Sequence, residues 1–329
     1  MKKRSMIFSK TLRMTAQTSK PLVINVFKPA RVTSYDVIRH YKKNLPQNFG
    51  KIGHFGTLDP FACGVLLIGI GGAARLNDLI HEYLPKTYLA IGKLGVETAT
   101  GDLTSSVTQQ DTSLYLRQEI GSFSKEFIQK QLREKFLGEY MQAPHQYSAA
   151  KFMGKKMHEW AREGVEIKKE EVRRFIYSIE VVKYAFPYLS LRVKVSSGTY
   201  VRTLFSDMSN YLGTLGCLVS LVRESVGHLD SKNALQKNKW PKERNESFYQ
   251  HGLDVDAVLP FAHYEFKPFE MKLFSNGVTL EMSRALLIQE GRLKNDYAWM
   301  YSDEGKLLGL AQIEENKFKP FINYSAGAV

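Results

Sequence analysis

The chain has 329 residues, of which 43% are hydrophobic and 24% charged, values typical of soluble globular proteins. This length suits two domains of the usual ~100–200 residues each. The formal net charge of +13 indicates a polyanionic partner, nucleic acid first and an acidic membrane surface second. No apolar run approaches the ~20 residues that cross a bilayer. The two cysteines, Cys63 and Cys217, exclude a disulfide framework or a cysteine-rich zinc cluster and favour reduced thiols in a cytoplasm.

The N-terminal segment, residues 1–21, is basic and rich in Ser and Thr, and the first acidic residue of the chain is Asp36. A transit peptide has a similar acid-poor composition. The segment lacks a clear amphipathic stripe, so we favour a disordered basic tail. Such a tail would add non-specific attraction to RNA phosphates.

Apolar residues at helical spacing predict several helices before residue 215. The first follows a capping box at Thr33–Asp36, and Pro85 closes the second. The predicted helical segments are 34–45, 76–83, 124–136 and 201–211. Alternating apolar residues predict strands at 88–94 and 189–195.

The C-terminal third of the chain has a different pattern. Residues 236–247 are polar and predict a surface connection. Beyond Pro260 the pattern changes to short strands. Trp299 and Leu310 flank Asp303-Glu304-Gly305, which predicts a hairpin.

The segment 53–66, Gly-His-Phe-Gly-Thr-Leu-Asp-Pro-Phe-Ala-Cys-Gly-Val-Leu, places one acid, Asp59, among three glycines and before an apolar run. Glycine permits positive φ and close backbone approach, so the carboxylate of Asp59 could be presented to a ligand. A turn aspartate that caps the next element, with Pro60 at its first position, explains these residues equally well.

This block resembles the catalytic signature of the TruB-type tRNA pseudouridine synthases, G-H-x-G-T-L-D-P-x-A-x-G-V-L. Phe55 and Cys63 replace threonines that are usual in the family. The resemblance implies that Asp59 is the catalytic nucleophile and that His54 lies at the pocket and helps the RNA to fold or flip. As chemistry alone, His54 is equally consistent with a satisfied turn residue, and we assign it no proton transfer.

Two further blocks resemble the family near the N-terminus and after the second helix. Residues 26–34 resemble the K-P-x-G-x-T-S block, which implies an RNA contact for Lys28. Arg31 occupies the glycine position of that block, and a side chain there disfavours a positive-φ turn. Residues 86–102 resemble K-x-Y followed by G-x-x-T-x-T-x-D, which implies that Tyr88 stacks on the target base. Without the resemblance, Tyr88 reads more simply as a strand aromatic that faces a core.

Residues 142–163 resemble the thumb segment that clamps the RNA arm in this family. Lys151 matches its lysine and suits a phosphate contact, and His145 replaces its second proline. A solvated basic helix is the commoner origin of such a run of lysines.

Residues 197–204 resemble the family's G-T-Y-I-R-T block. The resemblance implies that Arg202 pairs with Asp59 and that Tyr200 packs under the base. An adjacent positive charge would help to keep a partly buried aspartate ionised and nucleophilic. The following segment resembles the family's L-R-R ending, with Leu221 lining the pocket. Leu218 and Val222 depart from that ending, at a His and an Arg position, so an RNA-backbone contact is expected to be lost or moved there.

The resemblance implies an α/β fold: a catalytic domain at 22–258 with a mixed, largely antiparallel sheet, and a small β-rich, PUA-like RNA-binding domain at 259–329. It implies isomerisation of uridine 55 in the tRNA T-arm to pseudouridine, by a monomer in the cytoplasm without cofactor, metal, membrane or obligate protein partner. Two alternatives remain open. One is the same isomerisation on another RNA, because Arg31, Phe55, His145 and Val222 depart from the family in blocks expected to face RNA. The other is a non-catalytic RNA-binding or RNA-folding protein.

Overall fold

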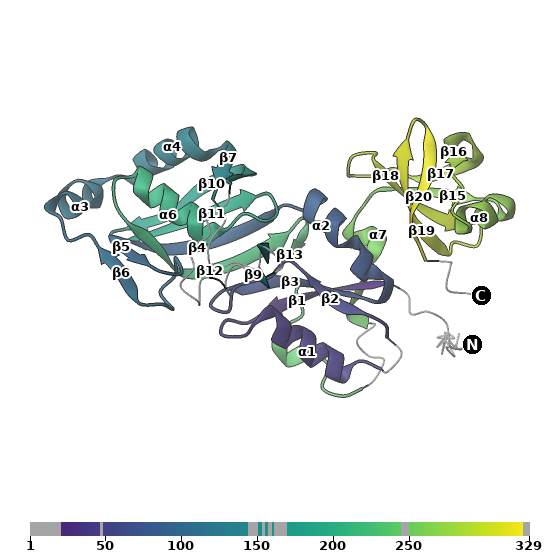
Figure 1. Cartoon of the computed structure of the whole chain (residues 1–329), viewed down its shortest axis with the longest axis horizontal. Coiled ribbons are helices and arrows are strands. Elements are labelled where there is room, and N and C mark those ends of the chain that lie inside the picture. The colour runs from purple at the N-terminus through teal and green to yellow at the C-terminus, as the bar shows by residue number, and fades with distance from the viewer. Residues whose placement is uncertain are drawn as a thin grey trace, which may run out of the picture. The chain divides into compact units, whose positions relative to one another are not determined.

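The computed structural model describes residues 21–46, 49–143, 151–152, 155–156, 160, 170–244 and 250–324. The chain divides into two compact units (Figure 1). The larger comprises Leu22–Gln47 and Ile52–Leu259, and the smaller includes Pro260–Val329. Within the described ranges, no helix is both long and apolar enough to span a membrane.

A ten-stranded sheet forms the centre of the larger unit. Its main path runs β14 (Gly252–Asp254), β1 (Leu22–Lys28), β3 (Cys63–Ile70), β12 (Gly216–Val226), β4 (Lys86–Leu94), β11 (Tyr188–Val195), β10 (Val172–Ala185), β7 (Gly138–Gln142). Off this path, β2 (Ile52–Phe55) pairs with β3, and β13 (Leu229–Asp230) pairs with β12. The pairing of β12 with β3 is parallel and the others are antiparallel, which confirms the predicted mixed, largely antiparallel sheet.

The predicted helices of this unit are confirmed. They are α1 (Ser34–Asn44), α2 (Asn77–Tyr83), α4 (Lys125–Phe136) and α6 (Val201–Tyr211). Thr33 and Asp36 form the capping box of α1, and the Ser124 hydroxyl caps α4. Two shorter helices are α3 (Leu114–Gln118) and α7 (Val255–Val258), and 3-10 turns occur at Gly71–Leu76, Ile120–Ser122 and Lys237–Lys239. Two further strand pairs lie outside the main sheet: β5 (Val96–Thr98) with β6 (Val107–Gln110), and β8 (Lys151–Phe152) with β9 (Lys155–Lys156).

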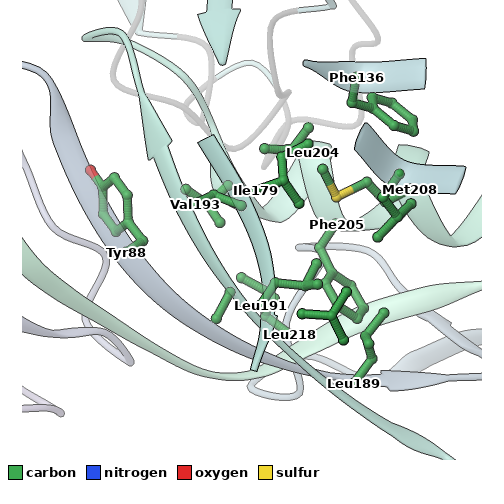
Figure 2. Packing of buried hydrophobic residues seen from close by; sticks show 14 of the residues in the cluster. Tyr88, Phe136, Ile179, Leu189, Leu191, Val193, Leu204, Phe205, Met208 and Leu218 are labelled. Carbon is green, nitrogen blue, oxygen red and sulfur yellow. The ribbon is translucent and has the colours of Figure 1, made fainter. Parts of the chain in front are cut away.

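The main core of the larger unit lies where α6 packs on the sheet (Figure 2). Leu204, Phe205 and Met208 supply the helical side, in keeping with their amphipathic spacing. Gly92 of β4 lets Phe205 approach the strand, because a Cβ on Gly92 would lie 2.0 Å from the Phe205 ring. Tyr88 belongs to the same buried cluster, so the reading of Tyr88 as a core aromatic is correct in part.

The smaller unit is β-rich, as predicted. Its sheet runs β16 (Leu280–Glu281), β20 (Lys317–Asn323), β19 (Leu307–Glu314), β18 (Tyr297–Ser302), β15 (Ala262–Phe266), β17 (Ala285–Gln289), and α8 (Pro268–Ser275) and a 3-10 turn at Met282–Arg284 accompany it. Trp299 pairs with Leu310, which confirms the predicted hairpin. Phe266, Phe274 and Phe318 lie in its hydrophobic core.

Several residues differ from the expectations above. Arg31 has φ 64°, so the positive-φ turn persists without the glycine. Phe55, which was placed in a block expected to face RNA, is 2% exposed and packs against Gly69, so its side chain lies in the core. Leu218 is fully buried, in keeping with the expected loss of an RNA-backbone contact at that position. Trp240 is buried at 4% exposure within the segment predicted as a surface connection, where its indole N–H donates to the Leu235 carbonyl.

Candidate active site

The loop that carries Asp59 lies between β2 and β3 and is held from α1. The Ser34 hydroxyl accepts from the Leu58 N–H at 2.9 Å and donates to the Leu58 carbonyl at 3.2 Å. On the other side of Asp59, the Pro60 carbonyl accepts from the Arg31 N–H at 2.7 Å. The residues that flank Asp59 are therefore fixed by hydrogen bonds, which restricts the positions open to its carboxylate.

Lys28 holds the neighbouring turn at residues 29–32. Its side chain is fully buried, and its ammonium donates to the carbonyls of Pro29 (3.0 Å) and Val32 (2.5 Å). Burial lowers the pKa of Lys28 to about 8. Lys28 thus braces the turn around Arg31 and is not part of the pocket lining described below. We therefore infer a supporting role for Lys28 and no direct substrate contact.

Asp59, Arg202 and Asp102 form a charged row. Nη2 of Arg202 donates to Oδ1 of Asp59 at 2.9 Å, and Nη1 lies 3.5 Å from Oδ2 of Asp102. Nη1 also donates to the Thr100 carbonyl at 2.7 Å. The Arg202 and Asp102 side chains are 5% and 4% exposed, whereas that of Asp59 is 33% exposed. Asp59 is thus the most exposed member of the row.

Burial raises the pKa of the Asp59 carboxyl above its ordinary value. The Arg202 guanidinium opposes this rise, and the carboxylate of Asp102 adds to it. Arg202 is therefore the main influence that favours the ionised, nucleophilic form of Asp59.

A pocket of about 360 Å³ opens above Asp59. It brings together most of the residues predicted from the sequence: His54, Asp59, Tyr88, Tyr200, Arg202 and Leu221. The side chain of Lys151, His145 and most of the thumb segment 142–163 lie outside the described residues. No group of three or more His, Cys, Asp or Glu side chains suited to a metal ion occurs among the residues that the structure describes.

Tyr200 is positioned by Gln142, the first residue of the predicted thumb segment, which was not predicted as a site residue in its own right. Tyr200 occupies the N-cap of α6, and its backbone N–H donates to Oε1 of Gln142 at 2.8 Å. Nε2 of Gln142 donates in return to the Tyr200 carbonyl at 3.0 Å. Gln142 is 2% exposed. This two-point contact fixes the strand-to-helix turn that carries Tyr200 and Arg202.

The pocket also contains basic residues that the sequence reasoning missed as site residues: His81 on α2, Lys86 on β4 and Arg223 on β12. Arg223 donates to the carbonyls of Val65 (2.7 Å) and Gly56 (2.9 Å), so it ties the Asp59 loop to β3 and β12. Burial lowers the pKa of His54, and Arg223 adds to the effect, which favours a neutral imidazole there.

Comparison with known proteins places the chain in a family. The model of the TruB family pseudouridylate synthase (N terminal domain) matches residues 42–201. A tRNA pseudouridine synthase B of Clostridium tetani (strain Massachusetts / E88) is 34% identical over 300 residues, 90% of this chain and 97% of that protein. This chain belongs to the TruB family of pseudouridylate synthases. A relative of the same name from Thermotoga maritima is 33% identical over 294 residues, 89% of this chain and 90% of the other.

Solved structures show the same fold. A crystal structure of a Cbf5-Nop10-Gar1 complex contains a chain that matches with a TM-score of 0.68 at 20% identity, over 100% of this chain and 96% of that chain. An H/ACA RNP bound to a substrate RNA containing 2'-deoxyuridine matches with a TM-score of 0.65 at 19% identity, over 98% and 95%. Together with the α/β architecture, these matches confirm the predicted fold class.

Proposed function

We propose that this TruB-family protein isomerises uridine 55 in the T-arm of tRNA to pseudouridine, with Asp59 as the catalytic carboxylate. The observation that carries the proposal is the 2.9 Å pairing of Asp59 with Arg202 at a pocket that Tyr88 and Tyr200 line. The tRNA pseudouridine synthase B relatives from Clostridium tetani and Thermotoga maritima support tRNA as the substrate class.

The reaction moves one glycosidic bond within the nucleotide. The bond between N1 of uracil and C1′ of ribose breaks, the base rotates, and a bond between C5 and C1′ forms. C5 loses a proton and N1 gains one, so atoms and charge balance without a further reactant. The carboxylate of Asp59 either attacks C1′ or removes a proton from the sugar to give a glycal, and both routes require its ionised form.

The target uridine must leave its stacked loop to reach this carboxylate. In our proposal the flipped base lies between Tyr88 and Tyr200, with Leu221 on the apolar wall. Tyr88 is 7% exposed and fixed in the core, so it offers a rigid stacking surface. A pocket of about 360 Å³ is in the range that holds a small ligand.

Binding of the rest of the RNA rests on charge. The net charge of +13 favours a polyanion. We assign the T-arm clamp to the thumb segment 142–163 with Lys151, diffuse attraction to the basic segment 1–21, and further RNA contacts to the β-rich C-terminal unit. The chain is proposed to act as a monomer without an obligate protein partner, in the cytoplasm.

Position mapping tests the proposal. An unmodified tRNA transcript is incubated with the full-length protein, and pseudouridine is mapped nucleotide by nucleotide. We expect one new pseudouridine, at position 55, and none in a matched transcript with cytidine at that position. Modification at another uridine, or only in a different cellular RNA, would contradict the assignment to uridine 55. Binding without any pseudouridine would favour an RNA-binding protein instead.

A further inference from the structure

Three basic side chains converge on one point beside Gly56, on the Asp59 loop. A Cβ placed on Gly56 would lie 3.5 Å from Nη1 of Arg223, 3.5 Å from Cε1 of His81 and 3.7 Å from Cε of Lys86. Gly56 has φ 92°, which L side chains rarely adopt, so this position stays without a side chain. We call the space bounded by Gly56, His81, Lys86 and Arg223 the basic cradle. It lies in the pocket that holds Asp59.

The guanidinium of Arg223 and the protonated form of Lys86 give the cradle a positive charge. Lys86 and Arg223 are 3% and 1% exposed, and neither forms an ion pair with an acid in the described part of the chain. Burial, with Arg223 adding to the effect, lowers the pKa of Lys86 to about 7. Buried charges are normally paired because isolation from water costs several kcal/mol. An anion in the cradle would offset that cost.

The donors in the cradle are already oriented. Nζ of Lys86 donates to Oγ of Ser197 at 2.6 Å and to the Leu84 carbonyl at 3.2 Å, which leaves its third N–H unused by the described residues. Oγ of Ser197 lies 2.5 Å from Nδ1 of His81. Burial is the main reason why the pKa of His81 is lowered to about 4. The charge of Lys86 lowers this pKa further, whereas the carboxylate of Asp78 raises it.

A neutral His81 fixes the direction of this hydrogen-bond chain. Because Ser197 accepts from Lys86, its own hydroxyl proton is free to go to Nδ1 of His81. The proton of the imidazole then sits on Nε2, next to the Cε1 atom that borders Gly56. Lys86 and His81 thus each keep one N–H for a ligand. The hydrogen bonds of Arg223 to described residues come from Nε and Nη2, whereas Nη1 is the atom nearest the cradle.

The register of the sheet relates the cradle to the proposed base site. Lys86 and Tyr88 are two residues apart on β4, so they share one face at a spacing of about 6.6 Å. Arg223 pairs directly with Tyr88 across β12 and β4. A nucleotide whose base stacks on Tyr88 would therefore have Lys86 and Arg223 within reach of its backbone.

We propose that the basic cradle binds the backbone phosphate on one side of the flipped uridine and so positions the sugar against Asp59. This inference rests on the proposed function. A phosphate has the charge and the several acceptor oxygens that match the converging N–H groups of Lys86, His81 and Arg223.

A thermodynamic cycle tests the phosphate contact. Equilibrium affinities of the wild type and Lys86→Gln are measured for a T-arm stem-loop RNA, and for the same RNA with a neutral methylphosphonate at the linkage 5′ or 3′ to the target uridine. Isomerisation leaves the phosphates unchanged, so turnover does not disturb the comparison. Lys194→Gln removes one charge from an exposed position on the neighbouring β11 and serves as the matched control.

We expect Lys86→Gln to weaken binding of the all-phosphate RNA about ten- to a hundredfold, as for loss of a hydrogen bond to a charged group. Its log–log salt slope should fall by about 0.7, the value for one single-strand phosphate. The wild type should lose a similar amount of affinity when one of the two linkages carries the methylphosphonate. On that substituted RNA, the wild type and Lys86→Gln should bind with equal affinity. Lys194→Gln should match the wild type throughout.

The contrary outcomes are distinct. An equal loss by Lys86→Gln on phosphate and methylphosphonate RNAs would place Lys86 against the base or in a purely structural role, and would overturn the proposal. No loss of wild-type affinity at either methylphosphonate linkage would also overturn it, whatever the folding of the variant. Failure of the proposed function would appear separately, as absence of pseudouridine in the wild-type reaction on the unsubstituted stem-loop.

Discussion

Arg202 lies between two carboxylates, with Nη2 2.9 Å from Oδ1 of Asp59 and Nη1 3.5 Å from Oδ2 of Asp102. The two acids differ in exposure: Asp102 is buried, whereas Asp59 is partly exposed and lines the pocket. One guanidinium therefore couples a structural acid to the proposed catalytic acid. The charge at either end of this row should alter the pH dependence of the reaction.

Replacement of Arg202 by Met should slow single-turnover chemistry about ten- to a hundredfold, the value of a lost hydrogen bond to a charged group. Affinity for tRNA should change little, because phosphate contacts dominate it. Arg202 lowers the pKa of Asp59, so its loss raises that pKa further. The ionised carboxylate is lost as pH falls through the pKa, so the acid limb of the rate profile should move to higher pH. A collapse of affinity with unchanged chemistry at saturation would instead make Arg202 a phosphate contact.

The change Asp102→Asn should move the acid limb in the opposite direction. The carboxylate of Asp102 raises the pKa of Asp59, so its removal lowers that pKa and extends activity to lower pH. The maximal rate should still fall, since Arg202 loses one of its anchors. A rate profile from pH 4 to 9, with thermal unfolding as a control for the turn that Asp102 holds through the Thr104 N–H, measures both effects. A shift to higher pH would contradict this account of the row.

The role of Tyr88 is separated by two replacements. Tyr88→Phe keeps the ring and should retain base flipping. Tyr88→Leu should lose about 1–3 kcal/mol of base-dependent binding, the range for one stacked base. Binding of a stem-loop with the target uridine is compared with that of an abasic stem-loop. A large loss of chemistry in Tyr88→Phe would indicate that the hydroxyl transfers a proton.

Gln142 offers a test of positioning with a matched control. Gln129 makes the same two-point contact with the backbone at Ile179 (2.9 Å) and Val181 (2.6 Å) and does not line the pocket. Gln142→Ala and Gln129→Ala should each reduce the free energy of unfolding by about 1–3 kcal/mol. Gln142→Ala should in addition raise the RNA concentration at which the single-turnover rate is half-maximal, because Tyr200 loses the hydrogen bonds that position it. Gln129→Ala should leave that concentration unchanged. Equal kinetics in the two variants would remove Gln142 from the site.

The sequence was informative where one segment carries both a backbone signal and a chemical group. The resemblance of the blocks around Asp59 and Arg202 to the family implied that both residues lie at a pocket, whereas the glycines alone left a turn aspartate equally open. Apolar periodicity predicted the helices of the catalytic unit. Arg31 shows the limit of such reasoning. Its positive φ is held by tertiary contacts, among them the hydrogen bond to Pro60, which override its local preference.

The basic residues were missed for a different reason. His81, Lys86 and Arg223 come from three separate elements, and only the fold brings them around Gly56. One signal was available, since Lys86 alternates with Tyr88 on a predicted strand and so shares its face. Phe55 was assigned to an RNA-facing block from motif position alone, and its burial shows it to be a core residue.

The most direct test of the central claim is the single-turnover rate of pseudouridine formation by Asp59→Asn on unmodified tRNA. The amide keeps the shape of the side chain but removes the charge that both proposed routes require. The account predicts folding and tRNA affinity close to those of the wild type, with no detectable pseudouridine at position 55. Substantial product at position 55 from the freshly purified variant, with asparagine verified by mass spectrometry, would contradict the assignment of Asp59 as the catalytic carboxylate.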